Sequence, residues 1–268
     1  MNILILGDVV GPAGREALKL NLPNILKEKN IDFTIVNGEN SADDGHGITK
    51  EIANMFFNIG VDVITSGNHI WDKNETTDFI TKEERLLRPA NFAEGSPGNG
   101  YGTYNVKGKK YKVGVINLMG NVFMRKTEDV FTTASKIKKK FILKKNFDFL
   151  IVDFHGETTS EKMAMGHYFD GQATAVVGTH THVPTADSRI LSNGTAYQTD
   201  IGMCGDYDSV IGMNKKNSLN KFLKEKDTTK HFPALGDATL SGIIVEGDIS
   251  TGLAKRIERF ISGGVLGN

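Results

Sequence analysis

The sequence predicts an α/β fold built around buried parallel strands. Short hydrophobic runs rich in β-branched residues alternate with amphipathic segments, which is typical of a layered α/β domain. Polar residues follow several of these runs directly, as happens where parallel strands end at a ligand-binding edge. The 268 residues contain no internal repeat, low-complexity tract or composition break, so we expect residues 1–268 to form a single domain.

The expected strands are apolar at nearly every position, because a strand covered on both faces has no side that meets water. In chain order they are Ile3 to Leu6, Phe33 to Val36, Val61 to Thr65, Val113 to Leu118, Phe149 to Val152 and Ala173 to Val177. After His182 the character of the sequence changes, with β-like runs at 188–191, 195–198, 239–246 and 253–260. The last two flank Gly247-Asp248 and favour an antiparallel hairpin.

The expected helices lie between these strands, at Ala13 to Lys29, Thr49 to Asn58, Lys73 to Ile80 and Thr132 to Lys145. Pro23 falls inside the first, and we expect it to kink or split that helix because proline lacks a backbone donor. In the last, lysines between 136 and 145 alternate with apolar residues. This pattern indicates a solvated basic face more than an RNA-binding surface.

The charge balance argues against a polyanionic partner. Lys plus Arg equals Asp plus Glu at 32 each, so no long-range field favours nucleic acid or an acidic membrane. Cys204 is the only cysteine, which excludes an internal disulfide and a multi-thiolate zinc site. The first residues lack the pattern of a signal peptide or a membrane span. We expect a cytoplasmic enzyme that captures a small charged ligand locally.

Five polar segments end hydrophobic runs. They are Gly7-Asp8, Asn37-Gly38-Glu39-Asn40, Gly67-Asn68-His69, Asp153-Phe154-His155 and Gly178-Thr179-His180-Thr181-His182. Parallel pairing of the preceding strands predicts that all five meet at one edge of one sheet.

Single segments leave alternatives open. Asp8 could instead cap the next helix, and Asn37-Gly38 could be an ordinary polar turn. Gly7, Gly11 and Gly14 loosely match a dinucleotide fingerprint, but their spacing is G-x-x-x-G-x-x-G and the second turn carries three polar groups. Trp71 could stack on a nucleobase or anchor the core. Residues 202–209 are too glycine-rich and polar for core, and could line the substrate cleft or an oligomer contact.

The histidines favour a metal site when the segments are taken together. His180 and His182 stand two apart, so in an extended segment both side chains point the same way, and His155 adds a third nitrogen. Asp8, Glu39, Asn40 and Asn68 add oxygen donors, and Glu39 could bridge two ions. Seven mixed donors suit two octahedral ions such as Mn²⁺ or Fe²⁺ better than one tetrahedral Zn²⁺. His69 beside them could act as a general acid.

The order Asp, acid-Asn, Gly-Asn-His, His and Gly-x-His-x-His resembles the calcineurin-like binuclear metallophosphoesterases, and more narrowly the bacterial YmdB-type cyclic-nucleotide phosphodiesterases. The resemblance runs from Gly7 to His182 and extends to the later hairpin and helical insertion. The superfamily has a histidine where this chain has Val10, and an acid where it has Ile70. Asp72 is then the candidate to orient His69.

The resemblance implies a four-layer α/β/β/α sandwich with the metal site at strand carboxyl ends, and an insertion or lid at about 206–230. One ion would be held by Asp8, Glu39, Asn40 and His182, and the other by Glu39, Asn68, His155 and His180. Iron or manganese is expected, with zinc or magnesium as alternatives. A metal-bridging hydroxide would attack phosphorus while His69 protonates the leaving oxygen.

The expected function is therefore metal-dependent hydrolysis of 2′,3′- or 3′,5′-cyclic nucleotides. The local motifs do not select a diester over a monoester, so a phosphomonoesterase or protein phosphatase is an alternative. A metal-containing regulatory protein that binds a nucleotide or RNA is another. Homo-oligomerisation would fit this branch, although the sequence identifies no interface.

Overall fold

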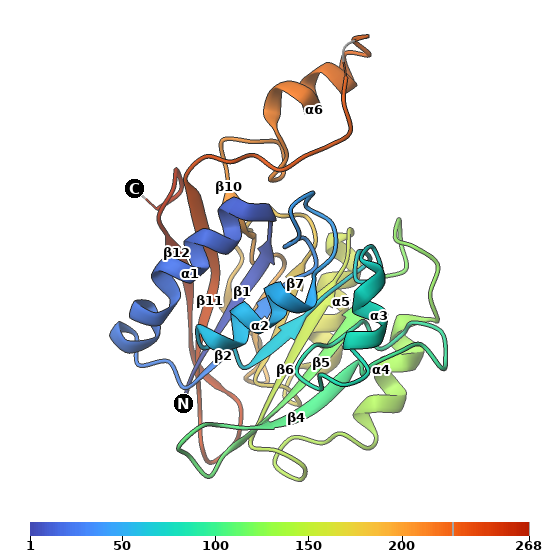
Figure 1. Cartoon of the computed structure of the whole chain (residues 1–268). Coiled ribbons are helices and arrows are strands. Elements are labelled where there is room, and N and C mark those ends of the chain that lie inside the picture. The colour runs from blue at the N-terminus through green and yellow to red at the C-terminus, as the bar shows by residue number, and fades with distance from the viewer. Residues whose placement is uncertain (227, 268) are drawn as a thin grey trace.

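The computed structural model describes residues 1–226 and 228–267, and within these ranges the strands form two six-stranded sheets (Figure 1). The sheets pack face to face, and helices cover the outer face of each. This is the expected four-layer α/β/β/α sandwich. Among the described residues, no helix is both long and apolar enough to cross a membrane.

The first sheet has the order β12-β11-β10-β1-β2-β3. Its strands are β1 (Asn2–Val9), β2 (Phe33–Asn37), β3 (Val63–Thr65), β10 (Met203–Asp206), β11 (Ala238–Gly247) and β12 (Ala254–Ser262). β1 pairs in parallel with β2 and β10, and antiparallel with β11. The antiparallel hairpin expected around Gly247 is confirmed by the pairing of β11 with β12.

The second sheet has the order β4-β5-β6-β7-β9-β8. Its strands are β4 (Tyr101–Asn105), β5 (Lys112–Met119), β6 (Phe149–His155), β7 (Ala175–Thr179), β8 (Arg189–Ile190) and β9 (Ala196–Gln198). β5, β6, β7 and β9 are parallel, so the carboxyl ends of β6 and β7 lie side by side.

The helices are α1 (Gly11–Glu28), α2 (Lys50–Asn58), α3 (Asn74–Phe79), α4 (Val130–Lys138), α5 (Thr159–Phe169) and α6 (Lys215–Phe222). Three apolar clusters fill the spaces between layers. One joins α1 and α2 to the first sheet, the second fills the space between the sheets, and the third joins α4 and α5 to the second sheet. Burial on both faces explains why the central strands read as continuous apolar runs.

Two helix expectations need correction. α1 runs without a break through Pro23, so a split there was wrong. Leu18, Leu22 and Ile25 are buried on either side of the proline, and this packing offsets the missing backbone hydrogen bond. α4 ends at Lys138 rather than 145, and Lys144 adopts a left-handed φ of 63° in the turn that follows.

Residues 202–209 also differ from expectation, because Met203–Asp206 form β10, which is buried within the first sheet. Glycines permit this close packing. A Cβ on Gly7 would overlap the carbonyl oxygen of Gly202, and a Cβ on Gly14 would overlap that of Cys204. Two of the three glycines that loosely matched a dinucleotide fingerprint, Gly7 and Gly14, therefore serve backbone contact between β1, α1 and β10, while Gly11 has a left-handed φ of 57° and lies against Pro233.

Between β10 and β11 the chain leaves the body and carries α6, and we call residues 207–237 the arm. Figure 1 shows it projecting beyond the strand ends. Asn217 in α6 connects this helix to the returning chain. Asn217 Nδ2 donates to the carbonyl oxygens of Thr229 and Lys230 at 3.3 and 3.2 Å, and Asn217 Oδ1 accepts from the Thr229 amide at 3.0 Å.

Candidate metal centre

The polar segments meet at the carboxyl ends of strands from both sheets. Asp8, Glu39, Asn40 and Asn68 come from β1 or follow β2 and β3 in the first sheet, whereas His155, His180 and His182 end β6 or follow β7 in the second. The expectation of one edge of one sheet was therefore wrong. β1 to β3 and β6 to β7 belong to separate sheets that face each other, and the segments lie where the two edges meet.

Three of the expected ligands converge on a fourth, the ring of His155. Its Nε2 lies 2.9 Å from Glu39 Oε1, 3.0 Å from His180 Nδ1 and 3.2 Å from Asn68 Oδ1. Glu39, His155 and His180 present their donor atoms within 4.8 Å of one another, a spacing that can hold a metal ion. These four residues are the set expected for one ion.

The other expected set lies beside it. Asp8 is fully buried, and its Oδ1 lies 3.7 Å from His155 Nδ1 and 3.9 Å from His182 Nε2. His182 Nδ1 contacts the Ile211 carbonyl oxygen at 2.8 Å, so this nitrogen donates and Nε2 is left with its lone pair towards Asp8.

These residues fit divalent cations. Asp8 Oδ1 and Asn40 Oδ1 are buried and accept no hydrogen bond from the described residues. Buried oxygens without a partner are unfavourable unless a cation or another donor meets them. A Cβ on Gly67 would overlap His155 Nε2 and Glu39 Oε2, so the chain leaves this volume free of side chain.

We expected the segment with His180 and His182 to be extended, and this was wrong. His180 and His182 have left-handed φ values of 100° and 66°, because the chain turns sharply after β7. The His180 amide donates to Asp8 Oδ2 at 3.0 Å, and Asp200 Oδ2 accepts from the Thr181 amide at 3.1 Å. Lys162 forms a buried ion pair with Asp200, and this pair holds in place the carboxylate that binds this segment.

Burial and charge shift the proton affinities strongly. Burial raises the pKa of Asp8. Burial would lower the pKa of His155, but the charge of Glu39 and its hydrogen bond outweigh this effect and raise the pKa to about 9. Burial and the neighbouring His155 lower the pKa of His180 to about 3. A cation bound at His155 Nε2 would take the place of the proton held there, so metal uptake would release a proton.

A buried carboxylate fixes the orientation of His155. Thr179 Oγ1 donates to Asp153 Oδ1 at 2.8 Å and lies 3.0 Å from His155 Nδ1. Since the hydroxyl hydrogen is used on Asp153, Nδ1 donates to Thr179, and Nε2 is the nitrogen that would give up its proton and offer a lone pair to a cation. Thr65 also donates to Asp153. Sequence reasoning missed both threonines, because strand position alone does not distinguish a packed threonine from a hydrogen-bonded one.

His69 lies at the rim, and Asp72 orients it. His69 Nδ1 lies 2.6 Å from Asp72 Oδ2, and Arg125 approaches the other carboxylate oxygen at 3.5 Å. The His69 amide donates to Glu39 Oε2 at 3.1 Å. The His46 ring meets His69 edge to face, with centroids 4.7 Å apart. His69 Nε2 is therefore the ring nitrogen that Asp72 leaves free.

Two alternatives can be set aside. Asp8 does not cap α1. The N-cap residue of α1 is Val10, and no side chain makes a capping hydrogen bond there. Trp71 packs against the core of the first sheet and the ring of Phe92, 6.1 Å away between centroids, and does not line the cavity at the metal centre. It is a core anchor.

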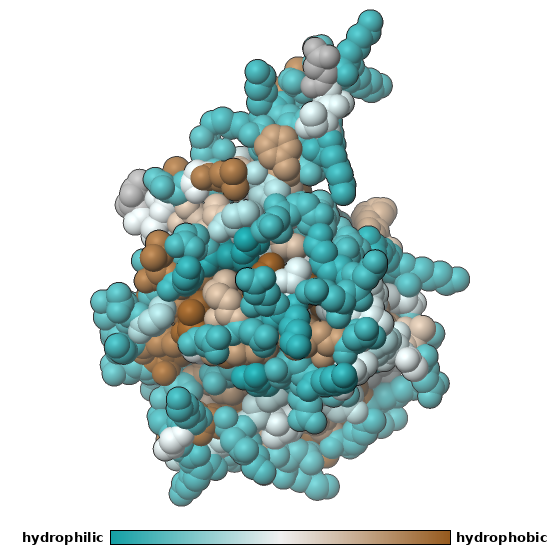
Figure 2. All heavy atoms as spheres, in the orientation of Figure 1, coloured by the Kyte–Doolittle hydropathy of each residue, from teal (hydrophilic) through white to brown (hydrophobic). Residues whose placement is uncertain are grey.

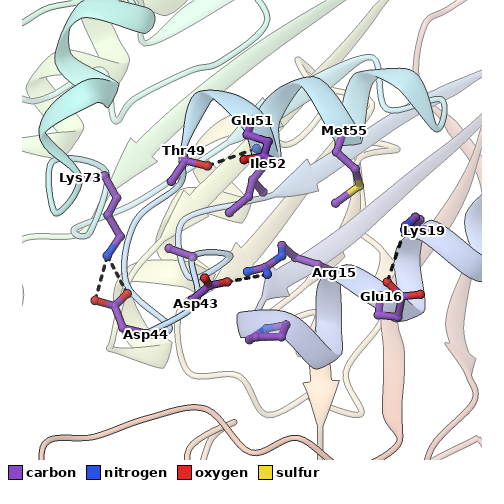
Figure 3. Close-up of a pocket in the computed structure, with 12 residues that line it drawn as sticks. Arg15, Glu16, Lys19, Asp43, Asp44, Thr49, Glu51, Ile52, Met55 and Lys73 are labelled. Atoms are coloured by element: carbon purple, nitrogen blue, oxygen red, sulfur yellow. Dashed lines mark hydrogen bonds and ion pairs between the residues drawn. The ribbon is translucent and has the colours of Figure 1, made fainter.

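A cavity of about 270 Å³ opens above the metal centre. It is lined by Glu39, Asn40, His46, His69, His180, His182, Val210, Ile211, Met213, Ser218, Phe222 and His231. A larger hollow between α1 and α2 holds none of the expected ligands, and most of its charges are paired with one another: Arg15 contacts Asp43, and Lys73 contacts Asp44 (Figure 3). The chemistry therefore belongs to the smaller cavity.

The fold and the site together define a metallophosphoesterase. A 5′-nucleotidase from Candida albicans has the same fold at a TM-score of 0.53 and 13% identity, covering 97% of this chain and 50% of that one. The chain belongs to the YmdB-like protein family, whose profile matches residues 4–260.

Relatives of high coverage agree with this placement. The chain is 46% identical over 261 residues to the 2′,3′-cyclic-nucleotide 2′-phosphodiesterase of Bacillus subtilis, covering 97% of each chain. It superposes on the crystal structure of a novel phosphatase from Mycoplasma pneumoniae with a TM-score of 0.88 and 37% identity, covering 98% of this chain and 93% of that one. The chain is therefore a hydrolase of the phosphoesterase superfamily.

Proposed function

We propose that the chain hydrolyses 2′,3′-cyclic nucleotides with the help of two divalent cations. The observation that carries the proposal is the convergence of Glu39, His155, His180 and Asn68 beside the unpartnered oxygens of Asp8 and Asn40. The similarity to the Bacillus subtilis phosphodiesterase supplies the substrate class. The 3′,5′-cyclic nucleotides are the second substrate to test.

Asp8, Glu39, Asn40 and His182 would hold one cation, and Glu39, Asn68, His155 and His180 the other. Two such cations supply a water molecule of lowered pKa and neutralise charge on the phosphoryl oxygens. Iron or manganese suits the mixed oxygen and nitrogen donors.

The protein residues contribute orientation and a proton. In the proposed reaction water attacks phosphorus, the P–O2′ bond breaks, and the 2′-oxygen takes up a proton to give a nucleoside 3′-phosphate. His69 is the proposed donor, because its Nδ1 is held by Asp72, its Nε2 is not engaged by that carboxylate, and the residue lines the cavity. Thr179 and Asp153 keep Nε2 of His155 directed at Glu39.

The charge of the cavity favours a diester. Among the described residues that line it there is no lysine or arginine. A phosphomonoester carries close to two negative charges at neutral pH, whereas a cyclic diester carries one, so the diester depends less on added positive charge. This supports the phosphodiesterase over the phosphomonoesterase alternative.

The test uses chelator-stripped protein with and without added Mn²⁺. We expect Mn²⁺ to restore hydrolysis of 2′,3′-cyclic AMP to adenosine 3′-phosphate, and of bis-p-nitrophenyl phosphate, but not of p-nitrophenyl phosphate. Preferred cleavage of the monoester would contradict the proposal and show that the chain is a phosphomonoesterase. Bound metal without turnover of any of these substrates would indicate a regulatory binding protein.

A further inference from the structure

The cavity above the metal centre has a polar floor and an apolar wall. The wall is supplied by the arm through Val210, Ile211, Met213 and Phe222. The floor consists of four of the proposed ligands and two further histidines, namely Glu39, Asn40, His180, His182, His46 and His69. Phe222 and Ile211 leave 78% and 54% of their surface exposed. Figure 2 shows apolar side chains gathered where the mostly hydrophilic arm meets the body. Large exposed apolar groups next to a reaction centre mark a surface that a ligand covers.

The wall is fixed to the metal centre rather than loosely placed above it. The Ile211 carbonyl oxygen accepts the hydrogen bond of His182 Nδ1 at 2.8 Å. Ile211 has a left-handed φ of 49°, which is rare for a β-branched residue and is found where surrounding contacts enforce it. A Cβ on Gly45 would lie 2.8 Å from Met213 Cε, so the wall also packs on the loop that carries His46.

Polar atoms without a partner stand on the same side of the cavity. Ser218 Oγ and His231 Nδ1 are buried and make no hydrogen bond with the described residues. Both residues belong to the arm and line the cavity. Buried polar atoms normally have a hydrogen-bond partner, so a bound ligand would be expected to supply the partner of these two atoms.

We infer that the arm forms the nucleobase site of the enzyme, with the base lying against Phe222 and its polar edge towards Ser218 and His231. This inference rests on the proposed function. When the cyclic phosphate lies on the floor beside His69, the attached nucleoside extends towards the arm wall. Every base has an apolar face, so stacking on Phe222 accepts all bases while favouring nucleotides over phosphodiesters that lack a base.

The experiment measures kcat/KM of the metal-loaded enzyme for 2′,3′-cyclic AMP and for glycerol 1,2-cyclic phosphate, which has the same type of ring without a base. In Phe222→Ala we expect the ratio of the two values to fall by about 5- to 100-fold, mainly through a higher KM for cyclic AMP. Phe222→Trp should keep the ratio. Leu223→Ala is the matched control, because Leu223 is the next residue, is 61% exposed and does not line the cavity.

The outcomes separate the inference from the proposed function. If the wild type hydrolyses both cyclic phosphates and Phe222→Ala leaves their ratio unchanged, the base site is wrong and the phosphodiesterase stands. An equal loss in Leu223→Ala would likewise reject it, because it would reveal a general effect on the arm. If the wild type hydrolyses neither cyclic phosphate, the proposed function fails and the base site fails with it.

Discussion

Lys162 Nζ lies 2.7 Å from Asp200 Oδ2, with only 1% of either side chain exposed. Removing one partner of such a pair leaves an uncompensated buried charge. We predict that Lys162→Met lowers the free energy of unfolding by about 3 to 5 kcal/mol, measured by urea denaturation. Lys139→Met on the exposed end of α4 should change it by less than about 0.5 kcal/mol. Equal stability of the two variants would contradict the assigned role of the pair.

His69→Ala should lower kcat for the cyclic diester by about 10²- to 10⁴-fold, because the leaving oxygen loses its proton donor. The metal content should stay that of the wild type, since it is the His69 backbone amide, and not the ring, that contacts Glu39. Asp72→Asn should reduce kcat less, because it leaves the ring in place and weakens only its orientation. Turnover kinetics and metal analysis of the same preparations check both points. Unchanged kcat in His69→Ala would favour a regulatory binding protein.

Asp62 should make stability fall as pH rises. Burial raises its pKa from 3.8 to about 6, although its Oδ2 accepts a hydrogen bond from the Thr34 amide. The folded state therefore binds the proton more tightly than the unfolded chain, so this stabilisation is complete below the unfolded pKa and is lost as pH rises through the folded value. Relative to wild type, Asp62→Asn should gain about 1 to 3 kcal/mol between pH 4 and 7.

The measurement for Asp62 is the difference in unfolding free energy between wild type and variant across that pH range. Asp78→Asn, at an exposed position of α3, serves as the control. A difference that is constant with pH would show that the Asp62 carboxyl does not titrate as stated.

Gly67→Ala should prevent metal binding without unfolding the chain. The added methyl group would overlap His155 Nε2 and Glu39 Oε2, two of the proposed donor atoms. We expect the variant to keep the circular dichroism spectrum of the wild type and to lose bound Mn²⁺ and activity together. Gly95→Ala, where an added Cβ meets nothing within 4 Å and the only cost is the left-handed φ of 84°, should retain both. Full metal content in Gly67→Ala would place the cations elsewhere.

Cys204 should not react with thiol reagents in the folded protein. Burial raises the pKa of its thiol to about 12, and the side chain has no exposed surface. Because the thiolate is the reactive form, a chromogenic disulfide reagent near pH 8 should label the protein only after denaturation. Rapid labelling of the native protein would mean that β10 opens.

The positions of the central strands along the chain were predictable, because burial on both faces leaves a continuous apolar run. β10 escaped this signal: Met203–Asp206 contain a glycine and an aspartate, and the strand is placed by the close backbone contact of Gly14 with Cys204. α5 was missed for a related reason, since its sequence has almost no apolar periodicity. Local sequence patterns predict helices and strands that have their own apolar periodicity, whereas β10 and α5 are defined by the residues that pack against them.

The candidate site was predictable as a set of residues, since polar segments at strand ends stand out in sequence. Its geometry was not. Assigning the segments to facing sheets requires knowing that β3 and β5 do not pair, and this is a tertiary property. The carboxylate that orients His69 is Asp72, three residues along the chain, and only the turn after β3 brings the two side chains to 2.6 Å.

The division of the proposed ligands between two sheets would link metal uptake to folding. Glu39 belongs to one half of the sandwich and His155 to the other, and their donor atoms are 2.9 Å apart only when the halves are docked. A cation that binds both lowers the free energy of the docked state and gains nothing from a chain in which the halves are separated. Removal of the metal would then lower the free energy of unfolding of the whole molecule. A cell short of metal would contain less folded enzyme as well as less active enzyme.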